Sequence, residues 1–323
     1  MRRGRTLLMD AQFHTRLPKE TLHPLMQRRH HPAVIRFVGM LVLLFGSGTG
    51  IVWFWAGPWW AEVLALLAFG AAGCSTFAAL HEAGHGTAFG SKTANRMAAF
   101  VAGWAHVYPP SIFRELHFTH HRHTHEPGKD PEISLGHKPL PSMLTEPPLY
   151  LSWLTGLPLL LFKVMMTLMG ALGMPEPIRQ KLYPFIRPEK RGEILVESWV
   201  VLGTQIGIGV LAVQVHPGFW GLMIGQVVAH MMLAGYLVME HNGLPHEGTI
   251  LERTRTIRVP GWVRLIMWNM PYHAEHHAYP AVPFHALPQL HKELKPELVN
   301  DTLSPAQFHK QTFKGWGRRP SQG

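Results

Sequence analysis

The chain has 323 residues, of which 46% are hydrophobic and 15% are charged, and its formal net charge is +10. Soluble domains carry roughly 25% charged residues, so this composition favours an integral membrane protein over a soluble one. The single cysteine, Cys74, excludes disulfides within the chain, cysteine-ligated zinc and cysteine-ligated iron–sulfur clusters. Because Cys74 lies within an apolar stretch, we expect it to be a buried packing residue.

The basic residues are concentrated at 1–36, 179–191 and 253–264, and all three segments lie outside the apolar stretches. Either a nucleic acid or an anionic lipid surface could attract such charge. Nucleic-acid binding needs a basic face on a soluble module, whereas basic segments that flank apolar stretches are typical of membrane proteins. We therefore expect contact with anionic cytoplasmic lipid and no nucleic-acid partner.

Four apolar stretches reach the roughly 20 residues that a helix needs to cross a bilayer. They are residues 38–57, 61–80, about 194–215 and 219–239. The short links within each pair contain no Lys or Arg, so the positive-inside rule puts the basic segments and both termini in the cytoplasm. The sequence thus predicts a basic cytoplasmic N-terminal tail at 1–36, a membrane domain at 37–295 and a cytoplasmic C-terminal tail at 296–323.

Two further apolar stretches are ambiguous. Residues 97–107 are short for a membrane span, so we expect them to be re-entrant or interfacial. Residues 149–172 are long enough to span, but Pro158 and Lys163 interrupt them. An additional crossing there would move all later residues to the other side of the membrane, so we predict a kinked interfacial helix.

Three histidine clusters lie at the edges of the apolar stretches. On a helix, positions i, i+3 and i+4 share one face, so each cluster can direct its imidazoles at one point. Neutral imidazole binds zinc, copper, iron and nickel. Eight histidines are too many for one ion but nearly fill the shells of two; they are His81, His85, His117, His120, His121, His273, His276 and His277.

Three other interpretations of the clusters deserve weight. The string from His81 to His85 also matches the signature of zinc metallopeptidases, with Glu82 as general base. A catalytic zinc takes only three protein ligands, however, which leaves two clusters without a role. An unstructured histidine-rich loop would be polar, yet aromatic and apolar residues flank these clusters. A metal transporter would bind its ion near the membrane midplane, where only His230 is expected.

The order His-x-x-x-His, His-x-x-His-His, His-x-x-His-His, at these gaps between spans, resembles the integral-membrane fatty acid desaturase and hydroxylase superfamily. The resemblance covers about residues 35–295. It implies two non-haem irons held almost wholly by histidine, with O₂ as co-substrate. Residues 236–243 are similar to the equivalent stretch of the alkane hydroxylases, which implies His241 as a ninth ligand rather than a residue that caps the helix end. We therefore predict an all-α membrane protein with four transmembrane helices and a helical cytoplasmic cap that holds the histidine-rich site.

Five carboxylates are candidates to support the metal ligands. Metal-bound imidazoles usually donate their second N–H to a carboxylate or a carbonyl. The candidates are Glu82, Asp130, Glu132, Glu240 and Glu275. Among the other histidines, His123 and His125 are expected to be hydrogen-bond donors near the site or surface groups. We expect His230, within a span, to be neutral and hydrogen-bonded, and we assign no role to His106, His246 and His285.

The resemblance implies a membrane oxidoreductase that acts on a lipid chain drawn from the bilayer, most specifically a fatty acyl desaturase. Hydroxylation of a carotenoid, an alkane or another lipid, and decarboxylation of a fatty acid to a terminal alkene, would use the same site. The chain has no cytochrome b5-like haem motif, no cysteine cluster and no dinucleotide fingerprint. We therefore expect a separate electron donor of the ferredoxin, rubredoxin or cytochrome b5 type, with its reductase.

Overall fold

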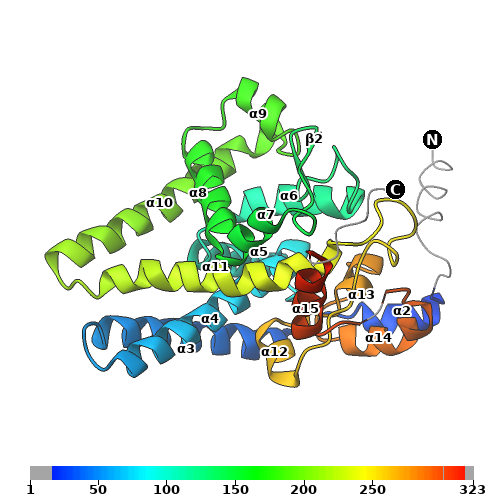
Figure 1. The fold of residues 1–323 in the computed structure, drawn as a ribbon, viewed down its shortest axis with the longest axis horizontal. Helices are drawn as coiled ribbons and strands as arrows, with labels where there is room; N and C mark the ends of the chain where they lie inside the picture. The colour runs from blue at the N-terminus through cyan, green and yellow to red at the C-terminus, as the bar shows by residue number, and fades with distance from the viewer. Residues whose placement is uncertain (1–16, 301, 317–323) are drawn as a thin grey trace.

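The computed structural model describes residues 17–300 and 302–316, and the fold within these residues is almost entirely helical (Figure 1). Four helices are long and apolar enough to cross a membrane. They are α3 (His30–Trp53), α4 (Trp59–His85), α10 (Arg191–Gln214, continued from the 3-10 turn η1, Pro188–Lys190) and α11 (Phe219–His241). This confirms the predicted all-α fold with four membrane helices.

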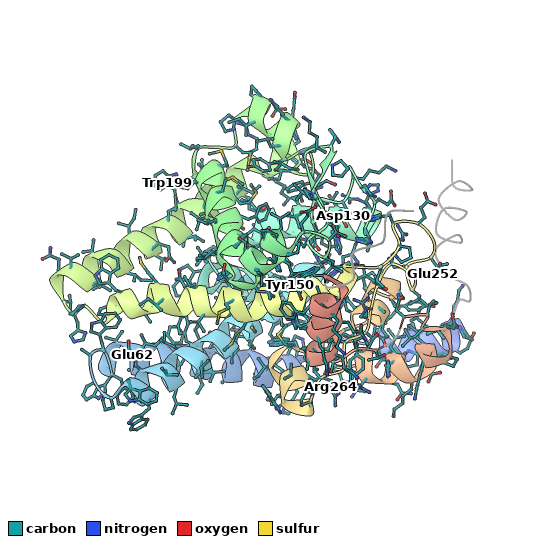
Figure 2. The ribbon with its side chains drawn as sticks, in the orientation of Figure 1. Glu62, Asp130, Tyr150, Trp199, Glu252 and Arg264 are labelled. Carbon is teal, nitrogen blue, oxygen red and sulfur yellow. The ribbon has the colours of Figure 1, made fainter. Side chains whose placement is uncertain are left out.

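The long helices form two hairpins that extend in the same direction (Figure 1). Helix α4 packs against both α3 and α11. Small residues allow this close approach, because a Cβ atom on Gly73 would lie 2.3 Å from the Cβ of Ala229. Figure 2 shows Glu62 beside the α3–α4 turn and Asp130 near the opposite end of the molecule. The α4–α11 contact therefore fixes the two helices whose far ends carry His81, His85 and His241.

The bounds of the helices differ from those of the predicted apolar stretches. Helix α3 begins at His30, inside the segment predicted as a tail, and ends at Trp53, before the predicted end at residue 57. Helix α4 continues through His85, so the first histidine cluster occupies its last two turns. The predicted tail residues 1–16 and 317–323 lie outside the described residues, and the domain boundaries stay predictions.

Shorter helices and one small hairpin surround the ends of the long helices. Helix α5 (Lys92–Ala105) is too short to span a bilayer, which agrees with the prediction for residues 97–107. The remaining elements are α2 (Lys19–Leu25), α5 (Lys92–Ala105), α6 (Pro110–His123), β1 (Ser134–Leu135), β2 (Lys138–Pro139), α9 (Glu176–Leu182), α12 (Gly261–Ile266), α13 (His273–Ala278), α14 (Leu287–Leu294), the 3-10 turn η2 (Lys295–Glu297) and α15 (Pro305–Trp316). Strands β1 and β2 pair antiparallel, with Ser134 opposite Pro139.

The stretch predicted as one kinked helix consists of two helices, α7 (Pro147–Leu154) and α8 (Leu157–Ala171), which are bent by 72°. The break lies at Gly156 rather than at Pro158. Gly156 has a φ of +73°, and an added Cβ would lie 2.2 Å from the backbone nitrogen of Met231 in α11. Only glycine tolerates both the left-handed conformation and this close approach. The bend therefore follows from packing against α11, which the local sequence does not reveal.

Candidate metal centre

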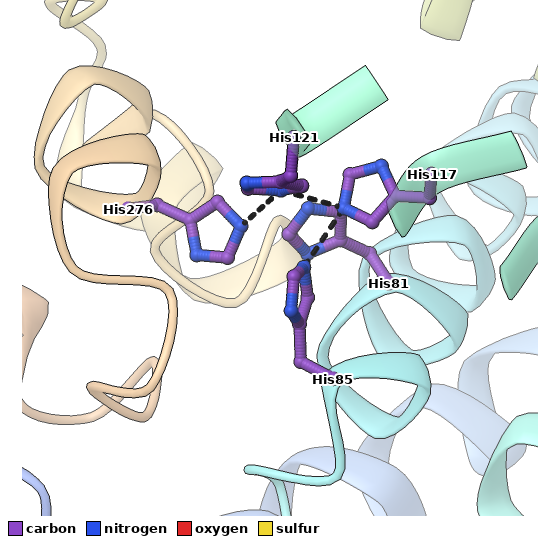
Figure 3. Close-up of side chains that lie close together, drawn as sticks. All are labelled: His81, His85, His117, His121 and His276. Carbon is purple, nitrogen blue, oxygen red and sulfur yellow. Dashed lines mark hydrogen bonds between the residues drawn. The ribbon is translucent and has the colours of Figure 1, made fainter. Parts of the chain in front are cut away.

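The nine predicted ligand histidines converge into two groups. Within each group, one nitrogen from every imidazole lies within 4.8 Å of one nitrogen from every other. Group A comes from α4, α6 and α13, as Figure 3 shows, and consists of His81, His85, His117, His121 and His276. Group B comes from α6, α11 and α13 and consists of His120, His241, His273 and His277. The structure thus brings together every predicted metal ligand, including the proposed ninth, His241.

The two groups share helices α6 and α13 and lie side by side. The rings of His121 in group A and His277 in group B stack with centroids 4.1 Å apart and planes inclined by 14°. Neighbouring residues on a helix point about 100° apart, so His120 and His121 enter different groups. The same holds for His276 and His277. Each His-His pair therefore serves two adjacent sites at once.

The contacts at the ends of α4 and α11 stop both helices beside the site. Gly86 takes a left-handed conformation with a φ of +74°, and its N–H donates to the carbonyl of Ala83. This C-terminal glycine stops α4 directly after His85. At the end of α11, the guanidinium of Arg255 donates to the carbonyl of Met239 over 2.6 Å. A cation at this position also suits the negative end of the helix dipole.

In group B the outer nitrogens of three of the four histidines are held by hydrogen bonds, so their inner nitrogens are presented to a common point. Nδ1 of His120 lies 2.9 Å from Asp130 Oδ2, and Nδ1 of His241 donates to the carbonyl of Arg253 over 2.9 Å. Nδ1 of His277 lies 3.2 Å from the Thr124 hydroxyl. An N–H on Nδ1 leaves the lone pair on Nε2, which is the arrangement that orients a metal-bound imidazole.

Group A has fewer such supports. Its inner Nε2 atoms approach closely, with 2.8 Å between His85 and His117 and 3.0 Å between His117 and His121. Both ring nitrogens of His81 and Nδ1 of His276 are buried without a hydrogen-bond partner in the described part of the chain. An unsatisfied buried polar group costs about 1–3 kcal/mol. A bound cation would accept the converging lone pairs and remove part of that cost.

The donor sets fit a pair of metal ions. All nine donors are imidazole nitrogens, which suits iron, zinc, copper or nickel better than magnesium or calcium. Burial lowers the pKa of His117, His121 and His276, and the neighbouring imidazoles lower it further. These residues are therefore neutral at physiological pH, which is the form that binds metal.

His120 is the exception. Burial alone would lower its pKa, but Asp130 and Glu132 raise the pKa of His120 to about 9. For the acid Asp130 the effects are reversed. Burial would raise the pKa of Asp130, whereas His120 and the backbone N–H groups of Glu132 and His125 lower it. Asp130 is therefore ionised and holds Nδ1 of His120 as a donor, as expected of a carboxylate that supports a metal ligand.

The five candidate carboxylates divide into two sets. Three of them lie close to a histidine of group B. Nδ1 of His120 is 2.9 Å from Asp130 and 3.5 Å from Glu132, and Nδ1 of His273 is 3.2 Å from Glu240. The other two make their hydrogen bonds elsewhere. Glu82 accepts from the backbone N–H of Phe284 at 3.1 Å, and Glu275 accepts from Thr256 at 2.6 Å and contacts His291. The sequence also allows Glu82 to be an exposed charge at the end of its helix, but Glu82 is buried.

The sequence reasoning missed two supports of group B. Thr124 follows His120 by one helical turn, so helical spacing could have indicated its contact with His277. The carbonyl of Arg253 lies 12 residues beyond His241 along the chain, and no sequence signal connects the two. The guanidinium of Arg253 also donates to the carbonyl of Thr124 over 2.9 Å, which joins these two supports.

A sequence profile of the fatty acid desaturase family matches residues 57–307. The chain belongs to the fatty acid desaturase family. One curated relative is a Caenorhabditis elegans protein described as a putative sphingolipid delta(4)-desaturase/C4-monooxygenase. It is 28% identical over 237 residues, which cover 70% of this chain and 56% of the relative. The chain thus matches little more than half the length of that relative. Family membership and four apolar helices together make this chain an integral membrane protein.

Other histidines of this desaturase-family chain lie outside the two groups. His125 is buried and donates from Nδ1 to the carbonyl of Pro245 over 2.9 Å, while His123 pairs with Glu126 at 3.5 Å. These positions match the two roles expected for this pair, one near the site and one towards the surface. His246 donates to the carbonyl of His125, which ties the loop after α11 to the end of α6.

A second buried polar cluster lies among the long helices. Nζ of Lys163 lies 2.6 Å from Nε2 of His106, and Nδ1 of His106 lies 3.2 Å from the hydroxyl of Thr76. His230 stacks on His106 with centroids 4.7 Å apart and donates to the carbonyl of Gln226. His230 is therefore hydrogen-bonded, as predicted. Lys163, predicted to interrupt an interfacial helix, is instead 1% exposed inside the bundle.

The convergence of the groups restricts the membrane topology. His85 ends α4 and His276 follows α11, yet they share group A, so both must lie on the same side of the membrane. Helices α10 and α11 account for two crossings between them. An odd number of further crossings would separate the two histidines. The bent pair α7–α8 therefore enters and leaves on one side.

The geometry disfavours the alternative interpretations. Three further histidines join the two of the zinc-peptidase string in group A, and Glu82, the expected general base, accepts a hydrogen bond from Phe284 rather than joining either group. The clusters lie on ordered helices, unlike a histidine-rich loop. Both groups lie where α4 and α11 end rather than near mid-span, unlike the ion site of a transporter.

Proposed function

We propose that this chain is an O₂-dependent di-iron oxidoreductase that acts on a lipid chain, and most specifically a fatty acyl desaturase. The observation that carries the proposal is the convergence of nine histidines into two adjacent groups at the ends of membrane helices. Membership of the fatty acid desaturase family supports the lipid substrate class and the choice of iron among the metals that imidazole binds.

The two groups would hold one iron each. When bound, the irons would supply the oxidising power to break an unactivated C–H bond, which amino-acid side chains cannot supply. The chain would contribute ligands, orientation and a water-poor site. Phe113 stacks on His117 with centroids 5.0 Å apart, and Phe118 lies 5.3 Å from His85. These aromatic rings place apolar surface against group A.

The same site could complete its reaction in two ways. Loss of a second hydrogen from the lipid chain would give a double bond, whereas transfer of oxygen would give an alcohol. The name of the nematode relative includes both a desaturase and a monooxygenase activity. Hydroxylation of a lipid is therefore the second candidate function, and the position of the chain relative to the two groups would decide between them.

We further propose that the metal site and both termini face the cytoplasm. The links between α3 and α4 and between α10 and α11 lack Lys and Arg, whereas the segments around the histidine groups are basic. The electron donor would be a separate ferredoxin, rubredoxin or cytochrome b5-type protein with its reductase. A basic surface near the site would suit an acidic carrier of this kind.

Metal analysis and lipid analysis together test the proposal. We expect close to two irons per purified chain, and we expect His120→Ala and His276→Ala each to lose iron and activity. Expression in a lipid-rich host, followed by mass spectrometry of the extracted lipids, should reveal a loss of two hydrogens or a gain of one oxygen, and neither without O₂. One zinc per chain, or product formation in the absence of O₂, would overturn the proposal.

A further inference from the structure

A large cavity adjoins group A on the side of α5 and α10. Its volume is about 1070 Å³, and its wall includes His85 together with residues from the ends of α4, α5, α6 and α10. Ligand sites commonly have volumes of about 300–1,000 Å³, so this cavity is large enough for a lipid headgroup and the start of its chain. A molecule bound there would touch a predicted metal ligand directly.

The cavity wall is rich in cations, and its acids are already engaged. Glu193 pairs with Arg96 at 3.0 Å and with Lys190 at 2.8 Å. Glu115 pairs with Arg187, which lies outside the cavity wall, at 2.7 Å. Glu197 accepts hydrogen bonds from the backbone and the hydroxyl of Ser111 at 2.8 and 2.9 Å.

Three further cations of the wall have no carboxylate at ion-pair distance within residues 17–300 and 302–316. Arg28 precedes α3, Lys92 begins α5 and Arg114 lies on α6, so the three come from separate elements. Arg28 and Lys92 are exposed. Cations that converge on one cavity from separate elements provide the positive field that a phosphate group needs.

The wall of the same cavity also contains exposed apolar side chains. Met97 and Phe100 on α5 line it, and they are 66% and 37% exposed. Val196, on the membrane helix α10, lines it too and is 62% exposed. In a membrane protein such exposed apolar side chains contact lipid chains. The cavity wall therefore combines cations, exposed apolar side chains and His85.

We infer that this cavity binds the phosphate-bearing headgroup of a phospholipid from the adjacent leaflet and directs its acyl chain towards group A. The inference rests on the proposed function and names its substrate class. A water-soluble acyl-CoA also carries phosphates, but it would not need the exposed apolar residues on α5 and α10 at the cavity. Basic pockets between membrane helices bind phospholipid headgroups by the same physics.

The test measures lipid binding separately from catalysis. The full chain, purified in detergent, is mixed with dioleoyl-phosphatidylglycerol or with dioleoylglycerol, which has the same chains without the phosphate, and bound lipid is counted by native mass spectrometry. We expect retention of phosphatidylglycerol to exceed that of dioleoylglycerol, and to fall about tenfold in the double variant Arg28→Gln/Lys92→Gln. Both substitutions lie on exposed residues, so folding should be preserved, which circular dichroism would verify.

The matched control is Lys181→Gln, which removes an exposed cation that does not line the cavity. Unchanged retention in this variant supports a defined site, whereas an equal loss would indicate general attraction to the basic surface and overturn the inference. Equal retention of the two lipids, or preferential binding and oxidation of oleoyl-CoA, would also overturn it. Phosphatidylglycerol that binds as expected but is never oxidised would instead refute the proposed function and leave the binding site in place.

Discussion

The two histidine groups differ in how firmly the protein holds them. All four residues of group B are buried, and each of its outer nitrogens faces Asp130, Glu240, Thr124 or the carbonyl of Arg253. In group A, His85 and His121 are partly exposed, and His81 has no hydrogen-bond partner in the described residues. Group B is thus arranged for binding by the fold alone, whereas group A depends more on the bound ion and lies beside the open cavity.

The largest effect should come from His277→Ala, because His277 belongs to group B and stacks on His121 of group A. Outer partners of metal ligands are worth roughly 10–100-fold in metal affinity, so loss of a ligand that also supports the second group should exceed that range. We expect loss of both irons and of measurable activity, as determined by elemental analysis and lipid turnover. Retention of one full iron would show that the groups are independent.

Asp130→Asn should affect group B alone. It removes the negative charge that fixes Nδ1 of His120, and we expect roughly a 10–100-fold loss of metal affinity at one of the two sites. Titration of the metal-free protein with iron under anaerobic conditions would measure this. Glu82→Gln is the matched control, since Glu82 bonds to Phe284 and contacts neither group. An equal loss in both variants would contradict the assigned role of Asp130.

Metal binding to group B should depend on pH. In the metal-free protein, Asp130 and Glu132 outweigh burial and raise the pKa of His120 to about 9, so His120 must release a proton to bind a metal. Affinity should then rise up to about tenfold per pH unit between pH 7 and 9 and level off above that. The pKa of His117, His121 and His276 is lowered, so these group A ligands release no proton over this range.

Calorimetry of metal binding in two buffers of different protonation enthalpy would count the released protons. We expect about one proton per pair of metals at pH 7.5. Asp130→Asn removes the charge that raises the pKa of His120, so the proton release should fall in this variant. No release in the unmodified protein would contradict the assignment.

The smallest effect should appear in the rate of metal removal. Because group A is partly exposed and borders the cavity, a chelator should extract its iron before that of group B. We expect iron release to show two kinetic phases of equal amplitude. The absorbance of the iron–chelator complex would measure this release. Asp130→Asn should accelerate only the slow phase. A single phase would mean that the two sites exchange metal as one unit.

Much of the fold and site could be predicted from the sequence. The four apolar stretches predicted the membrane helices because length and hydrophobicity are local properties. The spacing of the histidine clusters likewise predicted that their eight histidines would converge, and the resemblance to the alkane hydroxylases added His241. The assignment of each histidine to group A or B could not be predicted, because it depends on how α6 and α13 are rotated about their axes.

Long-range contacts account for the rest. The bend at Gly156 follows from its approach to Met231, and the burial of Lys163 follows from its contact with His106. The carbonyl of Arg253 supports His241 through the backbone, which carries no residue-specific signal. Asp130 could be predicted because it lies near the second cluster and because metal-bound histidines commonly donate to carboxylates.

The shared use of α6 and α13 has a consequence for biosynthesis. His276 and His121 lie 155 residues apart in the chain, yet both belong to group A, and group B also needs His273 and His277. Neither ion can gain its full ligand set until the ribosome has delivered α13, by which time all four membrane helices have been synthesised. If the chain binds iron as proposed, loading would therefore be a late step after membrane insertion, and a nascent chain stalled before residue 273 would reach quality control without metal.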